Sequence, residues 1–189
     1  MSISIKKHTQ PTKGFTLIEA LVAISVMLLS IGGPMAIAQK GIQNTVYARD
    51  QIVAFYIAQE GVELIRSIRD DNALAGVNWR TKISAAACVN AAGSGCGIDV
   101  DNMNFIDCAW SAGTACNLYY RAGGLSIGAD RGIYAHDTSG QPTIYSRSIK
   151  VLSVSGNEVS VDVTVRWLSR GTTKTITVQS RMFDQYNNI

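Results

Sequence analysis

The sequence predicts an α+β fold, in which a long N-terminal helix, transmembrane in its first part, packs on a C-terminal antiparallel β-sheet. A disulfide-tied loop region is expected between them. Three patterns in the 189 residues support this prediction. An apolar run near the N-terminus continues into a stretch with helical periodicity. Valines near the other end alternate with polar residues, as in a strand with one buried face. Four cysteines lie between these regions, where no long periodic run occurs.

The apolar run covers residues 15–38, about the length that a helix needs to cross a membrane. Glu19 is its only ionisable side chain. Basic side chains precede the run and acidic ones do not, so the positive-inside rule places residues 1–14 in the cytoplasm. Everything after Lys40 is then expected outside. The chain is predicted to cross the cell (inner) membrane once before any processing.

The sequence KGFTLIE at residues 13–19 closely resembles the cleavage and methylation motif of type IV prepilins and type II secretion pseudopilins. The match includes a short basic leader, the glycine before the cut, the phenylalanine after it, the glutamate and the apolar run. The resemblance implies that a prepilin peptidase cuts between Gly14 and Phe15 and that Phe15 is then N-methylated. It also implies other pilin or pseudopilin subunits as partners, and an inner-membrane assembly platform with a separate ATPase.

Glu19 has a physical role in this interpretation. A carboxylate at the edge of a membrane helix is costly unless it is paired. Cleavage after Gly14 creates a positive amine on Phe15, four residues away. In the resembled family the analogous glutamate is thought to meet the N-terminal amine of a neighbouring subunit. Glu19 is therefore expected to set the register of assembly, and snorkelling to the interface is the alternative.

A helix break is predicted within the apolar run at Gly32, Gly33 and Pro34. Proline removes a helical hydrogen bond and crowds the carbonyl of Ser30, so a kink or local melting is expected. Many type IV pilins also carry a helix-breaking residue in this part of the helix.

Two other interpretations of the apolar run stay open. One is a simple membrane anchor. The other is a secretory signal, because a small-residue site of the A-x-A kind follows the proline and ends at Ala38. Cleavage there would release a secreted, disulfide-linked binding domain that begins at Gln39. The length of the run and its carboxylate argue against a signal peptide.

Residues 39–71 are predicted to form the outer amphipathic half of the helix, packed on a globular domain. Their apolar side chains recur at spacings of three and four: Ile42, Val46, Val53, Ile57, Leu64, Ile65 and Ile68. The stretch 54–63 also resembles the corresponding helix of minor pilins and small pseudopilins. Within it, Gly61 is either a packing site or a tolerated helix glycine.

Residues 72–142 are rich in Ala, Gly, Asn and Ser and are predicted to form the variable loop region, with short strands near 118–121 and 132–135. Its cysteines form two Cys-x7-Cys segments: Cys88, Cys96, Cys108 and Cys116. An even count in an exported domain favours two disulfides. Local pairing, Cys88 with Cys96 and Cys108 with Cys116, is preferred among three connectivities, and free buried thiols are the alternative.

Residues 143–189 are predicted to form an antiparallel meander and a tail. The middle strand has one apolar face: Val159, Val161, Val163, Val165 and Trp167. Turns at 155–157 and 169–171 connect it to flanking strands at about 143–154 and 173–183. The second flanking strand has an apolar face formed by Ile176, Val178 and Met182. The apolar side of this sheet should cover the outer half of the helix. The order of helix, loop region and sheet resembles the pilin architecture.

The net charge of +3 comes from 17 Lys and Arg against 14 Asp and Glu. Lys6, Lys7 and Lys13 lie in the predicted leader, and without them the two signs balance at 14 each. This balance gives a general nucleic-acid role no support. A local basic cluster stays open, with these possible members: Arg121, Arg131, Arg147 and Lys150.

No enzyme signature stands out in the sequence. His8 lies in the leader, and His136, next to Asp137, is expected on a surface loop. Asp99, Asp101 and Asn104 are candidate calcium ligands, but Met103 falls where an EF-hand loop needs an oxygen ligand. No phosphate-loop motif is present. The chain is therefore predicted to be a structural subunit of a filament outside the cell membrane, a minor pilin or a pseudopilin, with no cofactor and no metal.

Overall fold

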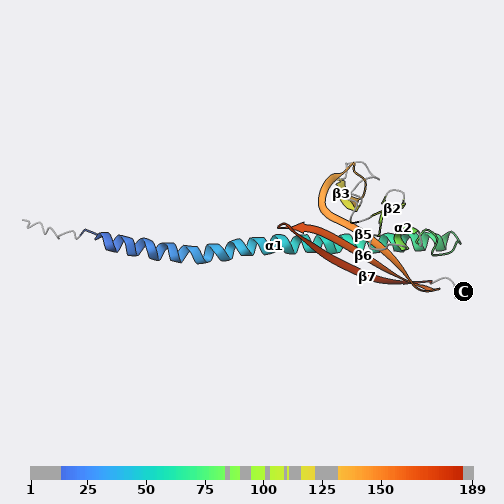
Figure 1. The fold of residues 1–189 in the computed structure, drawn as a ribbon, viewed down its shortest axis with the longest axis horizontal. Coiled ribbons are helices and arrows are strands. Elements are labelled where there is room, and N and C mark those ends of the chain that lie inside the picture. Colours follow the sequence, from blue (N-terminus) through green and yellow to red (C-terminus); the bar gives the residue numbers. More distant parts are fainter. Residues whose placement is uncertain are drawn as a thin grey trace, which may run out of the picture. The chain divides into compact units, whose positions relative to one another are not determined.

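The computed structural model divides the chain into two units, Met1–Val46 and Tyr47–Ile189. Helix α1, Leu17–Leu74, contributes its first part to one unit and its remainder to the other. The structure describes residues 14–83, 86–89, 95–100, 103–108, 110, 116–121 and 132–184. In the second unit, the long strands lie alongside the outer part of α1 (Figure 1).

The second unit is built on one antiparallel sheet. Within the described residues the sheet has seven strands: β1 Cys96–Ile98, β2 Phe105–Asp107, β3 Asn117–Arg121, β4 Ile133–Ala135, β5 Gln141–Ser155, β6 Glu158–Ser169 and β7 Thr172–Phe183. The long strand β5 pairs with β6 over most of its length, and β6 pairs in turn with β7. On its other side β5 pairs with β1 and β3, which carry β2 and β4. A short helix, α2 Ala86–Val89, precedes β1.

The long strands and two short ones confirm the sequence predictions. Strands β5, β6 and β7 lie where the meander was expected, and β3 and β4 lie at the two short stretches predicted in the loop region. Sequence reasoning missed α2, β1 and β2. These elements have only three or four residues each, so they show no periodicity of their own and depend on pairing with distant segments.

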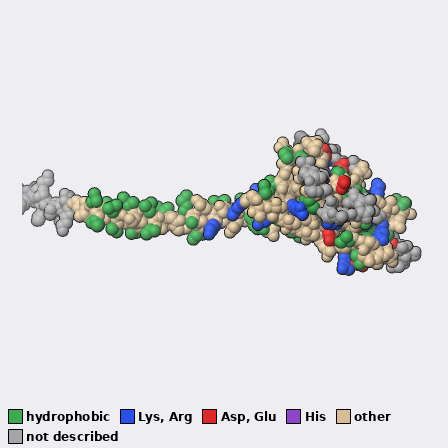
Figure 2. Space-filling view, in the orientation of Figure 1, with side chains coloured by type: hydrophobic (Ala, Val, Ile, Leu, Met, Phe, Trp, Pro, Cys, Tyr) green, Lys and Arg blue, Asp and Glu red, His purple; other side chains and the backbone are tan. Residues whose placement is uncertain are grey.

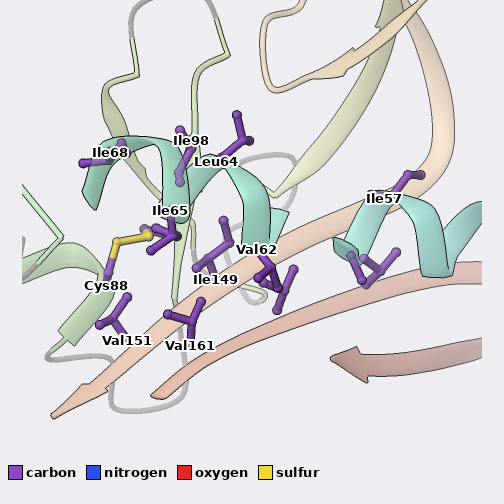
Figure 3. Close-up of a cluster of buried hydrophobic side chains, with 14 of the residues drawn as sticks. Ile57, Val62, Leu64, Ile65, Ile68, Cys88, Ile98, Ile149, Val151 and Val161 are labelled. Carbon is purple, nitrogen blue, oxygen red and sulfur yellow. A yellow bond between two sulfur atoms is a disulfide. The ribbon is translucent and has the colours of Figure 1, made fainter. Parts of the chain in front are cut away.

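The hydrophobic core lies between the outer part of α1 and the sheet. The predicted apolar face of β6, from Val159 to Trp167, is buried, and Met182 of β7 is buried beside it. Figure 3 shows Ile65 of α1 on the side of the helix that faces the strands, and Ile57 belongs to the same buried cluster. Ile42 and Val46, which belong to the same predicted apolar stripe, lie in the first unit and are exposed.

Helix α1 ends at Leu74, beyond the predicted end at residue 71. Asn72 fixes this end, because its side-chain amide donates hydrogen bonds to the carbonyls of Trp79 (3.1 Å) and Thr81 (2.6 Å). Gly76 follows with a φ of +68°, the left-handed conformation that commonly terminates a helix. The segment after the helix is thus tied back to its last turn.

Two disulfides tie the loop region, with the preferred local pairing. Cys88 of α2 is bonded to Cys96 of β1, and Cys108 is bonded to Cys116. Each pair is separated by 8 residues in sequence, so each closes a short loop and stabilises the domain by about 2–3 kcal/mol in the chain-entropy account. All four cysteines are buried.

At Gly61, helix α1 comes close to the sheet. A Cβ atom built on Gly61 would lie 2.8 Å from Cγ1 of Val163 and 3.2 Å from Cδ of Arg147. Val163 is fully buried and β-branched, so it has little freedom to move away. Of the two readings that the sequence left open for Gly61, the structure supports a packing site.

We predict that Gly61→Val lowers the free energy of unfolding by about 2 kcal/mol or more, because the added side chain overpacks the contact with Val163. Thermal unfolding of the full-length protein in detergent, followed by circular dichroism, measures this. Gly156→Ala is the matched control, since nothing lies within 4 Å of a Cβ at Gly156. Unfolding of Gly61→Val at the wild-type temperature would contradict the packing role.

Arg147 is buried in the same contact, with its side chain 0% exposed. Its Nη1 donates to the carbonyl of Ile57 (3.3 Å) and to Oε2 of Glu60 (3.2 Å), both on α1. Its Nε and Nη2 have no hydrogen-bond partner among the described residues. Burial, partly offset by Glu60, lowers the pKa of Arg147, although a guanidinium stays protonated in proteins.

This burial overturns the idea that Arg147 belongs to a surface basic cluster. The side chain of Arg147 faces α1, where it meets Ile57 and Glu60. Of the other possible members, Arg131 lies outside the described residues, and Lys150 is half-buried. The cation at position 147 serves the helix–sheet contact instead.

We predict that Glu60→Ala lowers the free energy of unfolding by about 3 kcal/mol, because it leaves the buried Arg147 cation with only the Ile57 carbonyl. Adding Arg147→Met to Glu60→Ala should restore much of this loss, since the orphaned charge is then removed. Chemical denaturation of the single and double variants measures both effects. Equal stability of Glu60→Ala and the double variant would rule out a buried-charge penalty.

Candidate assembly segment

The predicted scissile bond lies just before α1. Gly14, Phe15 and Thr16 precede the first helical residue, Leu17, and have no regular secondary structure. Phe15 is 82% exposed, and nothing lies within 4 Å of a Cβ built on Gly14. The Gly14–Phe15 bond is therefore exposed and outside the helix, which leaves it accessible to a protease.

Thr16 caps the start of α1. Its Oγ1 accepts a hydrogen bond from the backbone N–H of Glu19 (3.3 Å), and its carbonyl accepts from the N–H groups of Glu19 (3.1 Å) and Ala20 (3.2 Å). Sequence reasoning did not single out Thr16, although Thr followed three residues later by Glu is the capping-box pattern. The cap fixes the helix start two residues after the predicted cut.

Glu19 lies in the first turn of α1, where the partial positive charge of the helix N-terminus favours a carboxylate. Its side chain is exposed and makes no hydrogen bond or ion pair with any described residue. The carboxylate and the backbone of Phe15 lie at the same helix end. Among the described residues, this carboxylate is therefore left without a partner.

The apolar side chains in the described part of the first unit are exposed on the surface of α1. Every described residue from 14 to 46 is exposed, including Leu17 (83%) and Leu29 (80%). Figure 2 shows hydrophobic side chains gathered along this segment. By length and composition, α1 is able to span a membrane, the one such helix in the described part of the chain.

The two serines of this segment are satisfied within the helix. Oγ of Ser25 donates to the carbonyl of Leu21 (2.8 Å), and Oγ of Ser30 donates to the carbonyl of Val26 (2.7 Å). Such bonds remove the cost of placing a hydroxyl in hydrocarbon. Residues 17–38 contain three polar side chains, Glu19, Ser25 and Ser30. Of these, Glu19 alone has no partner among the described residues.

Comparison with known families matches residues 10–33 to the prokaryotic N-terminal methylation motif. Comparisons with curated proteins and with solved structures gave no match. The matched segment holds Gly14, Phe15 and Glu19, and the long apolar helix with a C-terminal sheet and two disulfides completes the pattern. The chain fits a type IV pilin-like protein. The motif is typical of structural subunits and implies processing by a prepilin peptidase and assembly into pilus-like filaments. Together with the apolar helix it supports anchoring in the membrane and then a location on the surface filament.

The pilin-like protein does not melt at Gly32, Gly33 and Pro34. Helix α1 continues through all three residues in the described chain, so the predicted local loss of helix is absent. A single proline costs about 3 kcal/mol, which the helical turns on both sides of it tolerate. A bend at this point, or loss of helix within an assembly, stays a prediction.

His136 of the pilin-like protein is buried, so its expected place on a surface loop was wrong. It follows β4 and lies against Gly97 of β1, where a Cβ would come within 2.8 Å of its Nε2. The glycine leaves room for the ring, and this contact depends on a strand that the sequence did not reveal. The neighbouring Asp137 has a lowered pKa, because Ser139 hydrogen-bonds to it and Arg121 lies 3.5 Å away.

The three residues considered as calcium ligands are Asp99, Asp101 and Asn104, and the structure does not describe all of them. Asp101 lies outside the described residues, and the backbone N–H of Asp99, after β1, donates to the carbonyl of Asn104, before β2 (2.9 Å). Met103 has a φ of +52°. The described residues contain no group of three or more His, Cys, Asp or Glu that could hold a metal ion.

Proposed function

We propose that this pilin-like protein is a minor pilin or pseudopilin, a structural subunit of a type IV pilus or a type II secretion-like filament. It inserts as a prepilin with residues 1–14 in the cytoplasm, is cut after Gly14, and assembles through its N-terminal helix. The supporting observation is the exposed apolar surface of α1, on which the Glu19 carboxylate has no partner among the described residues. A neighbouring helix would cover the apolar surface and supply a partner for the carboxylate.

The apolar surface extends further than a lone membrane anchor needs. Beyond residue 38, Ile42 (68%) and Val46 (52%) are exposed in the first unit. In the second unit a groove of about 450 Å³ lies along α1, lined in part by Phe55, Tyr56 and Ile176. Exposed apolar surface outside the hydrocarbon is unfavourable unless a partner covers it. Subunits packed side by side in a filament would supply that cover.

Helix packing in the filament would replace lipid contacts. Lipid and side chains are equally apolar, so the gain must come from close packing and polar pairing rather than from the hydrophobic effect. Gly32 and Gly33 are exposed on α1 with nothing near them, so they allow another helix to approach closely. Pairing of Glu19 with the amine of Phe15 on a neighbour would then favour one register. Energy for extraction would come from a separate ATPase at the assembly platform.

The proposal is tested by the N-terminus of the mature protein. We predict that mass spectrometry of protein from its native membrane finds a chain that begins at Phe15, N-methylated. Gly14→Val should block the cut, because a branched side chain then precedes the scissile bond. Gly41→Val serves as control, since its surroundings are equally open and it lies outside the motif. A mature chain that begins at Gln39 would support the secreted binding domain instead.

We predict that Glu19→Ala is inserted and cleaved as usual but enters filaments at least about tenfold less, because the neighbour's amine loses its carboxylate partner. Glu63→Ala is the matched control, since Glu63 is an exposed carboxylate on the same helix that pairs only with Arg66 among the described residues. Immunoblots of sheared filaments and membranes measure the two pools. Normal incorporation of Glu19→Ala would exclude the register role.

A further inference from the structure

A second site candidate lies on the outer face of the sheet, within the second unit. Arg166 stands between the buried Val165 and Trp167 on β6, so its side chain points away from the core. There it lines a cavity of about 260 Å³ together with Trp110 and residues of β3, β5 and β7. Pockets for drug-sized ligands have roughly 300–1,000 Å³, so this cavity suits a smaller ligand with a single ring.

Arg166 enters this cavity as a cation without a carboxylate partner. Its guanidinium lies 4.0 Å from the ring centroid of Trp110 and has no hydrogen bond or ion pair among the described residues. Asp162, the next acid back along β6 on the same face, is four residues away, about 13 Å by strand rise. It accepts hydrogen bonds from Gln179 and Ser160. Stacking occupies a face of the guanidinium and leaves its N–H edges available to a carboxylate.

The other polar groups around the cavity are neutral. The Oδ1 of Asn117 accepts a hydrogen bond from Ser146 (2.9 Å), which leaves the amide NH₂ of Asn117 without a described partner. Thr173 adds a hydroxyl from β7, and Ile144 adds an aliphatic wall. None of the described lining residues is acidic. The cavity thus combines one cation, several neutral hydrogen-bonding groups and apolar surface.

We infer that this cavity binds the carboxylate-bearing sugar ring of an acidic saccharide, such as a uronic acid. The carboxylate would pair with the N–H edge of Arg166, which forms charge-assisted bonds stronger than those of neutral donors. Ring hydroxyls would pair with Asn117, Ser146 and Thr173, and the C–H face of the ring would pack on Ile144 and the indole edge. A plain aliphatic acid would leave the three neutral groups unused.

The second disulfide holds the site together. Trp110 lies within the loop that Cys108 and Cys116 close, and Cys116 itself lines the cavity. The backbone N–H of Arg147 on β5 donates to the carbonyl of Cys116 (2.9 Å), which fixes this end of the loop on the sheet. The tryptophan is therefore presented to Arg166 by a cross-linked segment.

Titration of the full-length protein in detergent micelles with sodium D-glucuronate tests the inference, with tryptophan fluorescence as the signal because Trp110 lines the cavity. We expect a saturable change, and at least about tenfold weaker binding of D-glucose, which lacks the carboxylate. Arg166→Gln should bind glucuronate no better than glucose. Arg170→Gln, which removes the same charge at the nearby β6–β7 turn outside the cavity lining, should bind like the wild type.

Several results would overturn the inference. Equal affinity for glucose and glucuronate, or for glucuronate in wild type and Arg166→Gln, would remove the role of the cation. Acetate or sulfate that binds as tightly as glucuronate would show a simple anion site, and a peptide with a free C-terminal carboxylate that binds more tightly would show a protein partner. Unchanged unfolding temperatures of both arginine variants, which we expect, exclude misfolding as the cause.

Discussion

The contact between the outer part of α1 and the sheet is the constraint on which the rest of the second unit depends. Gly61 lets the helix approach β6 closely, and Arg147 of β5 reaches back to the helix carbonyl at Ile57 and to Glu60. One glycine and one buried cation thus fix both the distance and the position of the helix. The strands then form one continuous antiparallel sheet, whose inner face packs on the helix and whose outer face carries the cavity lined by Arg166.

The same helix meets two different environments along its length. In the second unit it buries one apolar stripe, from Ala54 to Ile68, whereas in the first unit its apolar side chains are exposed all round. A helix that is apolar on every side is stable only in lipid or among other helices. This change of environment within one element fits the pilin-like character that the N-terminal methylation motif indicates.

Most of the architecture could be predicted from sequence because its signals are local. The alternating valines of β6 and the KGFTLIE motif each lie within a few residues, and the Thr16 cap has an equally local pattern that was overlooked. Burial of His136 and Arg147 could not be predicted, because it depends on β1 and α1 passing close to them in the folded chain. The helix through Pro34 shows how strongly neighbouring turns override a single breaker.

The short sequence separation of both cystines has a consequence for the evolution of such a protein. Each cystine joins residues 8 apart, and β1 meets β5 at a single residue pair, Cys96 with Ile149. Both cross-links therefore lie within the loop region, and β3 joins this region to β5 through three further residue pairs. Residues of this region that lie outside the core can therefore change without altering the exposed N-terminal part of α1, whereas Cys88, Ile98 and Leu118 are held in the core with the outer part of the helix.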